Sequence, residues 1–306
     1  MDVDNPRITE RRNPASEGID MMSAREIVSL MSREDEKVIA AVRSAIPSIA
    51  RAAELVSEVV KRVGRVFYQG AGTSGRIAVL DAAEWTPTFG IDPDRVVALI
   101  AGGDKALRSS VEGAEDRADL GAGDLRTNGF SDSDLLIGVS ASGSTPYVLG
   151  GFSYAREVGA KSVAVTSNPG SPFHSAADVV IEVVAGPEVV TGSTRLKAGT
   201  AQKMVLNMIS TAAMVLANET YENLMVGLTA VNEKLTNRAV SMIREVSGVS
   251  AAEAHGALVE SDGSIKVALL CTCLEVSPDE SRLLLKRSDG SLRAAMEAAA
   301  ADECSG

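Results

Sequence analysis

The sequence predicts an α/β protein in which a parallel five-stranded sheet forms the middle of a three-layer α/β/α sandwich, followed by a small C-terminal helical domain. Short apolar runs rich in valine and isoleucine alternate with longer segments of helical periodicity, as in consecutive βαβ units. Aromatic residues make up only 3% of the chain, whereas glycine, alanine and valine are plentiful, which suits helices packed closely on a parallel sheet. The last part of the chain shows helical periodicity only.

Composition excludes several classes of function. The formal net charge is −11 and no block of basic residues interrupts it, so we expect no nucleic acid partner. No apolar stretch approaches the roughly 18 residues that a membrane-spanning helix needs, and the N-terminus has no apolar signal core. We therefore expect a cytoplasmic protein that does not bind membranes, in which an anionic ligand must be held by local features.

Cysteine and histidine do not suggest a metal centre. The three cysteines and two histidines are dispersed along the chain. Cys271 and Cys273 share an apolar helical segment, where core packing explains them better than a reactive thiol pair does. We expect no metal site and no cofactor.

The chain begins with a polar segment, residues 1–20, that we interpret as an arm. Two helical segments follow, from about residue 24 to 31 and from 33 to 55, with Pro47 as a break or as the first turn of a new helix. Hydrophobic residues within 38–60 favour a homodimer formed through these helices.

The first predicted strand, residues 65–68, ends at a glycine-rich turn that reads GAGTSGR and leads at once into a helix. Glycines allow a ligand to approach the backbone, and the free N–H groups and dipole of a helix N-terminus favour an anion. Gly72, Thr73 and Ser74 are therefore candidate phosphate ligands. A Walker A loop is excluded because no Gly-Lys-Ser/Thr follows. A dinucleotide loop fits less well, because the acidic residue expected about 20 residues further on comes later here. A plain tight turn remains the alternative without function.

Carboxylates follow this loop in two places. Glu84 ends the next helical segment, where it is a candidate site residue, a face exposed to solvent or a cap. After the second predicted strand, residues 96–100, three acidic residues stand close together: Glu112, Glu115 and Asp116. Such a cluster can keep a carboxylate available as an acid or a base, although a solvated turn explains it equally well.

A second hydroxyl-rich turn follows the third predicted strand, residues 134–139. Ser140, Ser142 and Thr145 lie in the segment SASGSTP, and its proline suits the first turn of a helix. Because the carboxyl ends of parallel strands meet at one edge of the sheet, we expect the two turns to form one phosphate site. Serines that cap a helix would account for one or two of these hydroxyl groups, but not for four.

Two more strands, 162–166 and 179–183, complete the predicted sheet. The segment TGSTRLKAGT then opens a long apolar helix and offers Arg195 and Lys197 to an anion. After a polar stretch, three short helices and a last one near 278–300 form the tail. We accordingly divide the chain into an arm (1–20), an α/β domain with its N-terminal helices (21–222) and a helical domain (223–306).

These segments together resemble one family of the sugar isomerase (SIS) fold, the N-acetylmuramic acid 6-phosphate etherases. The resemblance spans almost the whole chain. The matching segments are ITERRN (8–13), GAGTSGR (70–76), DAAE (81–84), LIAGG (99–103), VEGAED (111–116), TPY (145–147), SNPG (167–170), TGSTRLKAGTAQK (191–203) and NLMV (223–226). Two positions depart from the family pattern: Trp85-Thr86 replaces a small residue and proline, and Ser144 replaces an arginine.

The resemblance implies a lyase that cleaves the D-lactyl ether of N-acetylmuramic acid 6-phosphate during cell-wall recycling. It implies that Glu84 is the general acid and Glu115 the second catalytic carboxylate, acting as the base. We expect Trp85 and Phe89 to bury Glu84, and Arg195 or Lys197 to hold the lactyl carboxylate. A sugar-phosphate-sensing regulator without catalysis and an aldose–ketose isomerase remain the alternatives.

Overall fold

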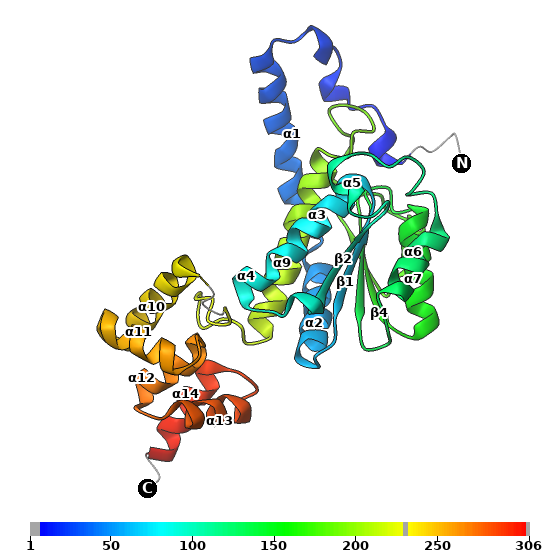
Figure 1. Ribbon diagram of the computed structural model, residues 1–306. Helices are drawn as coiled ribbons and strands as arrows, with labels where there is room; N and C mark the ends of the chain where they lie inside the picture. Colours follow the sequence, from blue (N-terminus) through cyan, green and yellow to red (C-terminus); the bar gives the residue numbers. More distant parts are fainter. Residues whose placement is uncertain (1–6, 229–231, 304–306) are drawn as a thin grey trace. The chain divides into compact units, whose positions relative to one another are not determined.

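The computed structural model describes residues 7–228 and 232–303, so residues 1–6 of the predicted arm and Cys304 lie outside the described residues. The described chain separates into two compact units (Figure 1). One contains the residues up to Ala82 and Asp94–Ala213, and the other contains Ala83–Pro93 and the residues from Met214 onward. The stretch that carries Glu84 therefore groups with the C-terminal helices, a division that the sequence did not indicate.

Five strands form one parallel sheet in the first unit, as predicted. They are β1 (Val66–Gly70), β2 (Val96–Ile100), β3 (Leu135–Val139), β4 (Lys161–Thr166) and β5 (Val179–Glu182), in the order β2-β1-β3-β4-β5. The chain moves outward from β1 to β2 and then crosses back to β3. The crevice between the carboxyl ends of β1 and β3 is therefore a topological switch point, where α/β proteins bind ligands.

Helices cover both faces of this sheet, with α6 and α7 on one side and α2, α3 and α9 on the other (Figure 1). Their bounds are α2 (Ile46–Lys61), α3 (Gly72–Ala83), α6 (Ala118–Thr127), α7 (Pro146–Val158) and α9 (Lys197–Leu216). The strands are fully buried in the middle of the sheet, since every residue of β1 and β3 is buried. Parallel strands covered on both faces need such continuous apolar runs.

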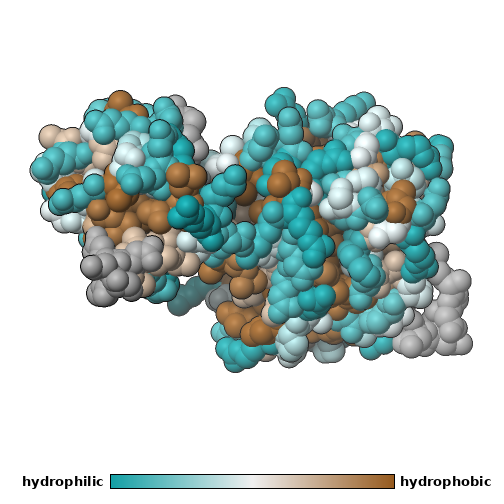
Figure 2. Space-filling model, turned by 90° about the horizontal axis from the view of Figure 1, so that it is seen from below, coloured by the Kyte–Doolittle hydropathy of each residue, from teal (hydrophilic) through white to brown (hydrophobic). Residues whose placement is uncertain are grey.

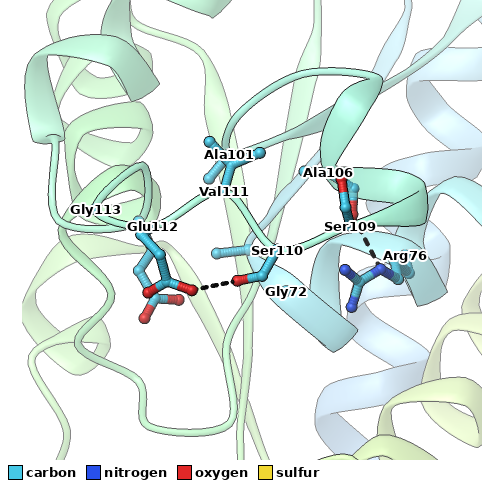
Figure 3. Close-up of a pocket in the computed structure, with 11 residues that line it drawn as sticks. Gly72, Arg76, Ala101, Ala106, Ser109, Ser110, Val111, Glu112 and Gly113 are labelled. Carbon is cyan, nitrogen blue, oxygen red and sulfur yellow. Dashed lines mark hydrogen bonds between the residues drawn. The ribbon is translucent and has the colours of Figure 1, made fainter.

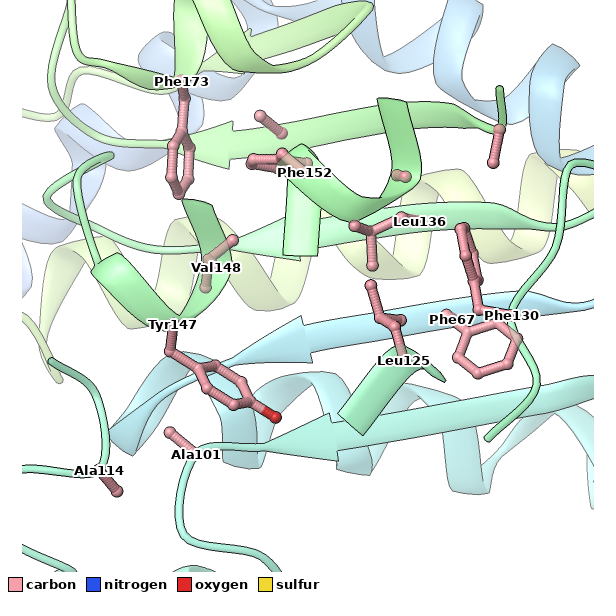
Figure 4. Packing of buried hydrophobic residues seen from close by; sticks show 13 residues of the cluster. Phe67, Ala101, Ala114, Leu125, Phe130, Leu136, Tyr147, Val148, Phe152 and Phe173 are labelled. Atoms are coloured by element: carbon pink, nitrogen blue, oxygen red, sulfur yellow. The ribbon is translucent and has the colours of Figure 1, made fainter. Parts of the chain in front are cut away.

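Aromatic side chains fill the layer under α6 and α7 (Figure 4). Phe67 meets Phe130 edge to face with ring centres 5.0 Å apart, and Phe152 meets Phe173 in the same way. Helices α6 and α7 approach each other at a glycine: a Cβ on Gly121 would lie 1.8 Å from the carbonyl oxygen of Tyr147. This close contact fixes the start of α7, and with it the loop that precedes α7.

On the opposite side, a buried carboxylate connects α3 to its neighbours. Asp81 accepts a hydrogen bond of 2.8 Å from the Tyr68 hydroxyl of β1 and one of 3.2 Å from the Ser210 hydroxyl of α9. Helix α1 (Ala24–Ser44) begins with a capping box of Ser23 and Glu26, and α2 starts anew with Pro47 in its first turn, as expected.

The remaining elements of the described chain are short or belong to the second unit. The short ones are η1 (Ile8–Glu10), η2 (Pro14–Ser16), η3 (Ile19–Met21), η4 (Pro93–Arg95), α5 (Lys105–Arg108) and α8 (Phe173–Ala176). The second unit contains α4 (Trp85–Phe89), α10 (Glu233–Ser247), α11 (Ala251–Glu260), α12 (Ile265–Leu274), α13 (Pro278–Arg287) and α14 (Leu292–Glu303).

The last predicted helix was wrong as a single element. It is divided into α13 and α14 by a turn in which Asp289 and Gly290 both have positive φ angles and the Gly290 N–H donates to the Leu285 carbonyl. The helices of this unit pack around their own apolar core, which includes Met242, Leu258 and Leu269. Within the described residues, none of the helices is both long enough and apolar enough to span a membrane.

Candidate active site

The turn after β1 is shaped by glycines. Gly72 begins α3 with a φ of +52°, a value that favours glycine, and a Cβ on Gly70 would lie 2.8 Å from the Gly75 backbone nitrogen. The turn places Thr73 and the buried Ser74 in the first turn of α3. Within the described residues, neither hydroxyl has a hydrogen-bond partner, which leaves both for a ligand.

The turn after β3 is organised by its own hydroxyl groups. The Ser140 Oγ lies 2.7 Å from Thr145 Oγ1 and 3.1 Å from Ser142 Oγ, and the Gly143 N–H donates to Ser140 Oγ. Gly143 has a φ of +66°, and a Cβ there would lie 2.2 Å from the Ser171 Oγ. The hydroxyl groups are thereby held together at the entrance to α7.

The two turns line one polar pocket of about 320 Å³, above the neighbouring strands β1 and β3. Seven of the predicted site residues meet there: Gly72, Thr73, Ser74, Glu115, Ser140, Ser142 and Thr145. Ser144 lines the pocket as well. The sequence prediction that both loops serve one site agrees with this arrangement.

Glu115 also lines a second pocket of about 150 Å³, which shares Ala71 and Gly72 with the first (Figure 3). Its backbone is fixed because its carbonyl oxygen accepts a 3.0 Å hydrogen bond from the Tyr147 N–H at the start of α7. The side chain is exposed to solvent. Figure 3 shows Glu112 paired with Ser110 on one side of this second pocket and Arg76 on the other.

The comparisons with known proteins agree with this geometry. The SIS domain family matches residues 123–212, and the family described as the glucokinase regulatory protein N-terminal SIS domain matches residues 48–156. A phosphoheptose isomerase structure from Neisseria gonorrhoeae aligns with a TM-score of 0.50 at 18% identity, covering 62% of this chain and 98% of that chain. This structural likeness shows the fold.

Sequence relatives decide the family. The N-acetylmuramic acid 6-phosphate etherase of Serratia proteamaculans is 47% identical, covering 94% of this chain and 97% of that protein. N-acetylmuramic acid 6-phosphate etherase 2 of Vibrio cholerae is 46% identical, covering 95% of this chain and 94% of that protein. The chain belongs to the N-acetylmuramic acid 6-phosphate etherase family.

Glu84, the predicted acid of this etherase family member, lies outside the residues that line either pocket. It immediately follows α3 and precedes α4, in the second unit. The expectation that Glu84 is buried was wrong for the described chain: Trp85 and Phe89 are buried, but Glu84 is exposed. In the short helix α4 the two aromatic residues share one face, and the residue before Trp85 falls outside that face.

Lys197 does not face the pocket either, which contradicts its predicted role as an anion ligand. Its Nζ lies 2.7 Å from Glu34 Oε2, and both side chains are buried. Burial raises the pKa of Glu34, but hydrogen bonds from Lys197, Lys37 and Asn13 outweigh it and lower this pKa to about 2. The Lys197 ammonium is therefore committed to a structural ion pair.

The segment before α9 reaches the pocket through residues that the sequence analysis did not select. Gly192 and Thr194 line the polar pocket, whereas Arg195 is exposed and does not. Glu188 fixes this segment by accepting hydrogen bonds from the N–H groups of Lys197 and Ala198, and burial raises the pKa of its carboxyl.

The N-terminal arm also enters the site, through Arg7 and Glu10. Thr9 holds the arm in place: its N–H donates to Asn168, its hydroxyl accepts from the Asn168 amide, and its carbonyl accepts from the Gly192 N–H. The motif ITERRN was the only sequence signal for this contact. Among the described residues, no group of three or more histidine, cysteine or acidic side chains could hold a metal ion.

Proposed function

We propose that this protein is a carbon–oxygen lyase that cleaves the D-lactyl ether of N-acetylmuramic acid 6-phosphate. The products are N-acetylglucosamine 6-phosphate and D-lactate, and the reaction serves peptidoglycan recycling and amino sugar catabolism. The observation that carries the proposal is the polar pocket in which both hydroxyl-rich loops and Glu115 meet, in a chain of this family.

The phosphate group of the substrate would occupy the hydroxyl end of the pocket. Ser74, Ser140, Ser142 and Thr145 offer hydroxyl groups from two loops, and Gly72 and Thr73 offer N–H groups at the start of α3. A helix N-terminus favours negative charge, and several donors suit a group whose oxygens must all be bound.

The chemistry requires two proton transfers. Opening the sugar ring exposes an aldehyde at C1, which acidifies the proton on C2, so that the ether at C3 becomes β to a carbonyl group. A base removes the C2 proton, the C3–O bond breaks, and an acid protonates the departing ether oxygen to release D-lactate. Water then adds at C3 of the unsaturated aldehyde. Positioned proton transfers of this kind accelerate a reaction by about 10²–10⁴ each.

We assign the base to Glu115 and the acid to Glu84. The position of Glu115 in the wall of the polar pocket supports its assignment. The assignment of Glu84 rests on its match to the general acid of the family. Arg195 is our proposed ligand of the lactyl carboxylate, because Lys197 is paired with Glu34.

We further propose a cytoplasmic homodimer. Helices α2 and α9 form an exposed apolar groove of about 480 Å³, whose lining includes Ile46, Ile49, Met208 and Ala212. Ile46 and Met208 remain 51% and 39% exposed, which is unusual for side chains of this kind unless a partner covers them. Figure 2 shows hydrophobic side chains gathered in patches on the face that it presents.

The decisive experiment follows oxygen atoms. The purified protein is incubated with N-acetylmuramic acid 6-phosphate in ¹⁸O-water, and lactate and sugar are measured by mass spectrometry. We expect lactate without the label and sugar phosphate with one labelled oxygen at C3, because the ether oxygen leaves with lactate and water adds to the sugar. Binding of the sugar phosphate without lactate release would instead indicate a sensor. Deuterium uptake at C2 without lactate release would indicate an isomerase.

A further inference from the structure

The charges around the polar pocket are unbalanced. Three carboxylates line it, from Glu10, Glu115 and Asp116. Among its lining residues in the described chain, Arg7 is the only one with a positive charge. A phosphate dianion brought among three carboxylates is repelled unless a cation lies beside it.

Arg7 lies at the serine end of the pocket. It also lines a neighbouring pocket of about 300 Å³, which shares Ser142 with the polar pocket and extends towards Asn168. Glu115 is absent from that neighbouring pocket and instead faces the one beside Gly72, to which Arg7 does not contribute. The guanidinium is therefore on the side of the hydroxyl groups, and the proposed base is on the other side.

The backbone at Arg7 is held in place, but its side chain is not engaged. The Arg7 carbonyl accepts a 2.9 Å hydrogen bond from the Glu10 N–H, and Thr9 is fixed to Asn168 and Gly192. Within the described chain, the Arg7 guanidinium has no hydrogen bond and no ion pair. An exposed arginine on an anchored backbone is available for a ligand.

We propose that Arg7 is a phosphate-binding residue, carried into the site by the N-terminal arm, and that it pairs with the phosphate group beside Ser142. The proposal rests on the proposed function for the identity of the sugar, but the phosphate contact can be tested without turnover. A guanidinium presents a planar fork of donors that matches two phosphate oxygens, and such charge-assisted bonds are among the strong ones.

The test compares Arg7→Met with Arg7→Lys and with the control Arg12→Met, an exposed arginine of the same arm that lines neither of these pockets. For Arg7→Met we expect KM for the sugar phosphate and the inhibition constant of inorganic phosphate to rise together, by about 10- to 100-fold. Arg7→Lys should recover part of this loss. We expect kcat to change little, inhibition by D-lactate to stay as in the wild type, and Arg12→Met to behave like the wild type.

Two results would overturn the proposal. One is an unchanged affinity of Arg7→Met for phosphate. The other is a loss of D-lactate inhibition with phosphate inhibition retained, which would place the guanidinium at the carboxylate of the substrate. If the wild type releases no lactate, the proposed function fails, and calorimetric titration with N-acetylglucosamine 6-phosphate still decides whether Arg7 binds the phosphate group.

Discussion

At the scale of single residues, the two proposed catalytic carboxylates differ in how the structure supports them. Glu115 is held by a backbone hydrogen bond to the first turn of α7, which also carries the end of the hydroxyl-rich loop. Its distance from the proposed phosphate ligands is thereby fixed by one short segment. Glu84 is held only by its place between α3 and α4, next to the buried Trp85.

Substitution of either carboxylate should separate catalysis from binding. We expect Glu84→Gln and Glu115→Gln each to lower kcat for lactate release by about 10² or more, since each removes one proton transfer. Thermal unfolding and the affinity for N-acetylglucosamine 6-phosphate should stay close to the wild type. Substantial lactate release by Glu84→Gln would remove this residue from the mechanism. Glu112→Gln, in the same acidic turn, is the matched control, and its kcat should stay near that of the wild type.

At the scale of elements, a buried polar network joins the arm, α1 and α9. Asn13 of the arm donates to Glu34 of α1 and to the Pro187 carbonyl, and Glu34 pairs with Lys197 at the start of α9. Three segments that are distant in sequence are therefore connected at one carboxylate. Removing one partner leaves an uncompensated buried charge, which is costly.

We expect Lys197→Met to lower the free energy of unfolding by about 3–5 kcal/mol, measured by urea denaturation. Lys37→Met is the matched control, because Lys37 pairs with the same carboxylate from an exposed position and should contribute at most about 1 kcal/mol. Equal losses in the two variants would contradict a buried network centred on Lys197.

The same network predicts how stability depends on pH. Because the pKa of Glu34 is lowered from 4.5 to about 2 in the folded chain, its contribution is complete above pH 4.5 and is lost as the pH falls towards 2. The difference in stability between the wild type and Glu34→Gln should therefore shrink across this window. A difference that stays constant from neutral pH to pH 2 would argue against an ionised Glu34.

Helices α6 and α7 supply a second test at the element scale. Gly121→Ala should destabilise the protein by about 1–3 kcal/mol, because its Cβ would lie 1.8 Å from the Tyr147 carbonyl oxygen. Gly123→Ala, two residues further along α6, meets no atom within 4 Å and should be neutral or stabilising by up to about 1 kcal/mol. Similar unfolding curves for the two variants would show that the helices can separate without cost.

At the scale of the whole molecule, the apolar groove between α2 and α9 predicts self-association. Ile46→Asp places a charge in this groove, and burying it in an interface is unfavourable. We expect the dissociation constant of the dimer to rise by about 10-fold or more, measured by sedimentation equilibrium. Leu283→Asp, at an equally exposed position on α13, is the control. A wild type that sediments as a monomer at all concentrations would refute the dimer.

The parts of the site that were predictable from the sequence are those specified by local signals. Glycines and hydroxyl residues directly after apolar runs identified both phosphate-type loops, because a strand, a tight turn and a helix N-terminus each have a short-range signature. The turn at Asp289 and Gly290 had such a signature too, but the apolar periodicity on both sides of it concealed the break between α13 and α14.

What the sequence alone determined is the parallel sheet, the two loops at its carboxyl edge and, through whole-chain similarity, the family. The tertiary structure decided which polar side chains face the site. Lys197 and Arg195 are two residues apart, yet one is buried against Glu34 and the other is exposed, because α9 turns them to different sides. Arg7 reaches the pocket only because Thr9 docks on Asn168, a contact between residues 159 positions apart. Such contacts depend on the packing of distant segments, which leaves no local pattern in the sequence.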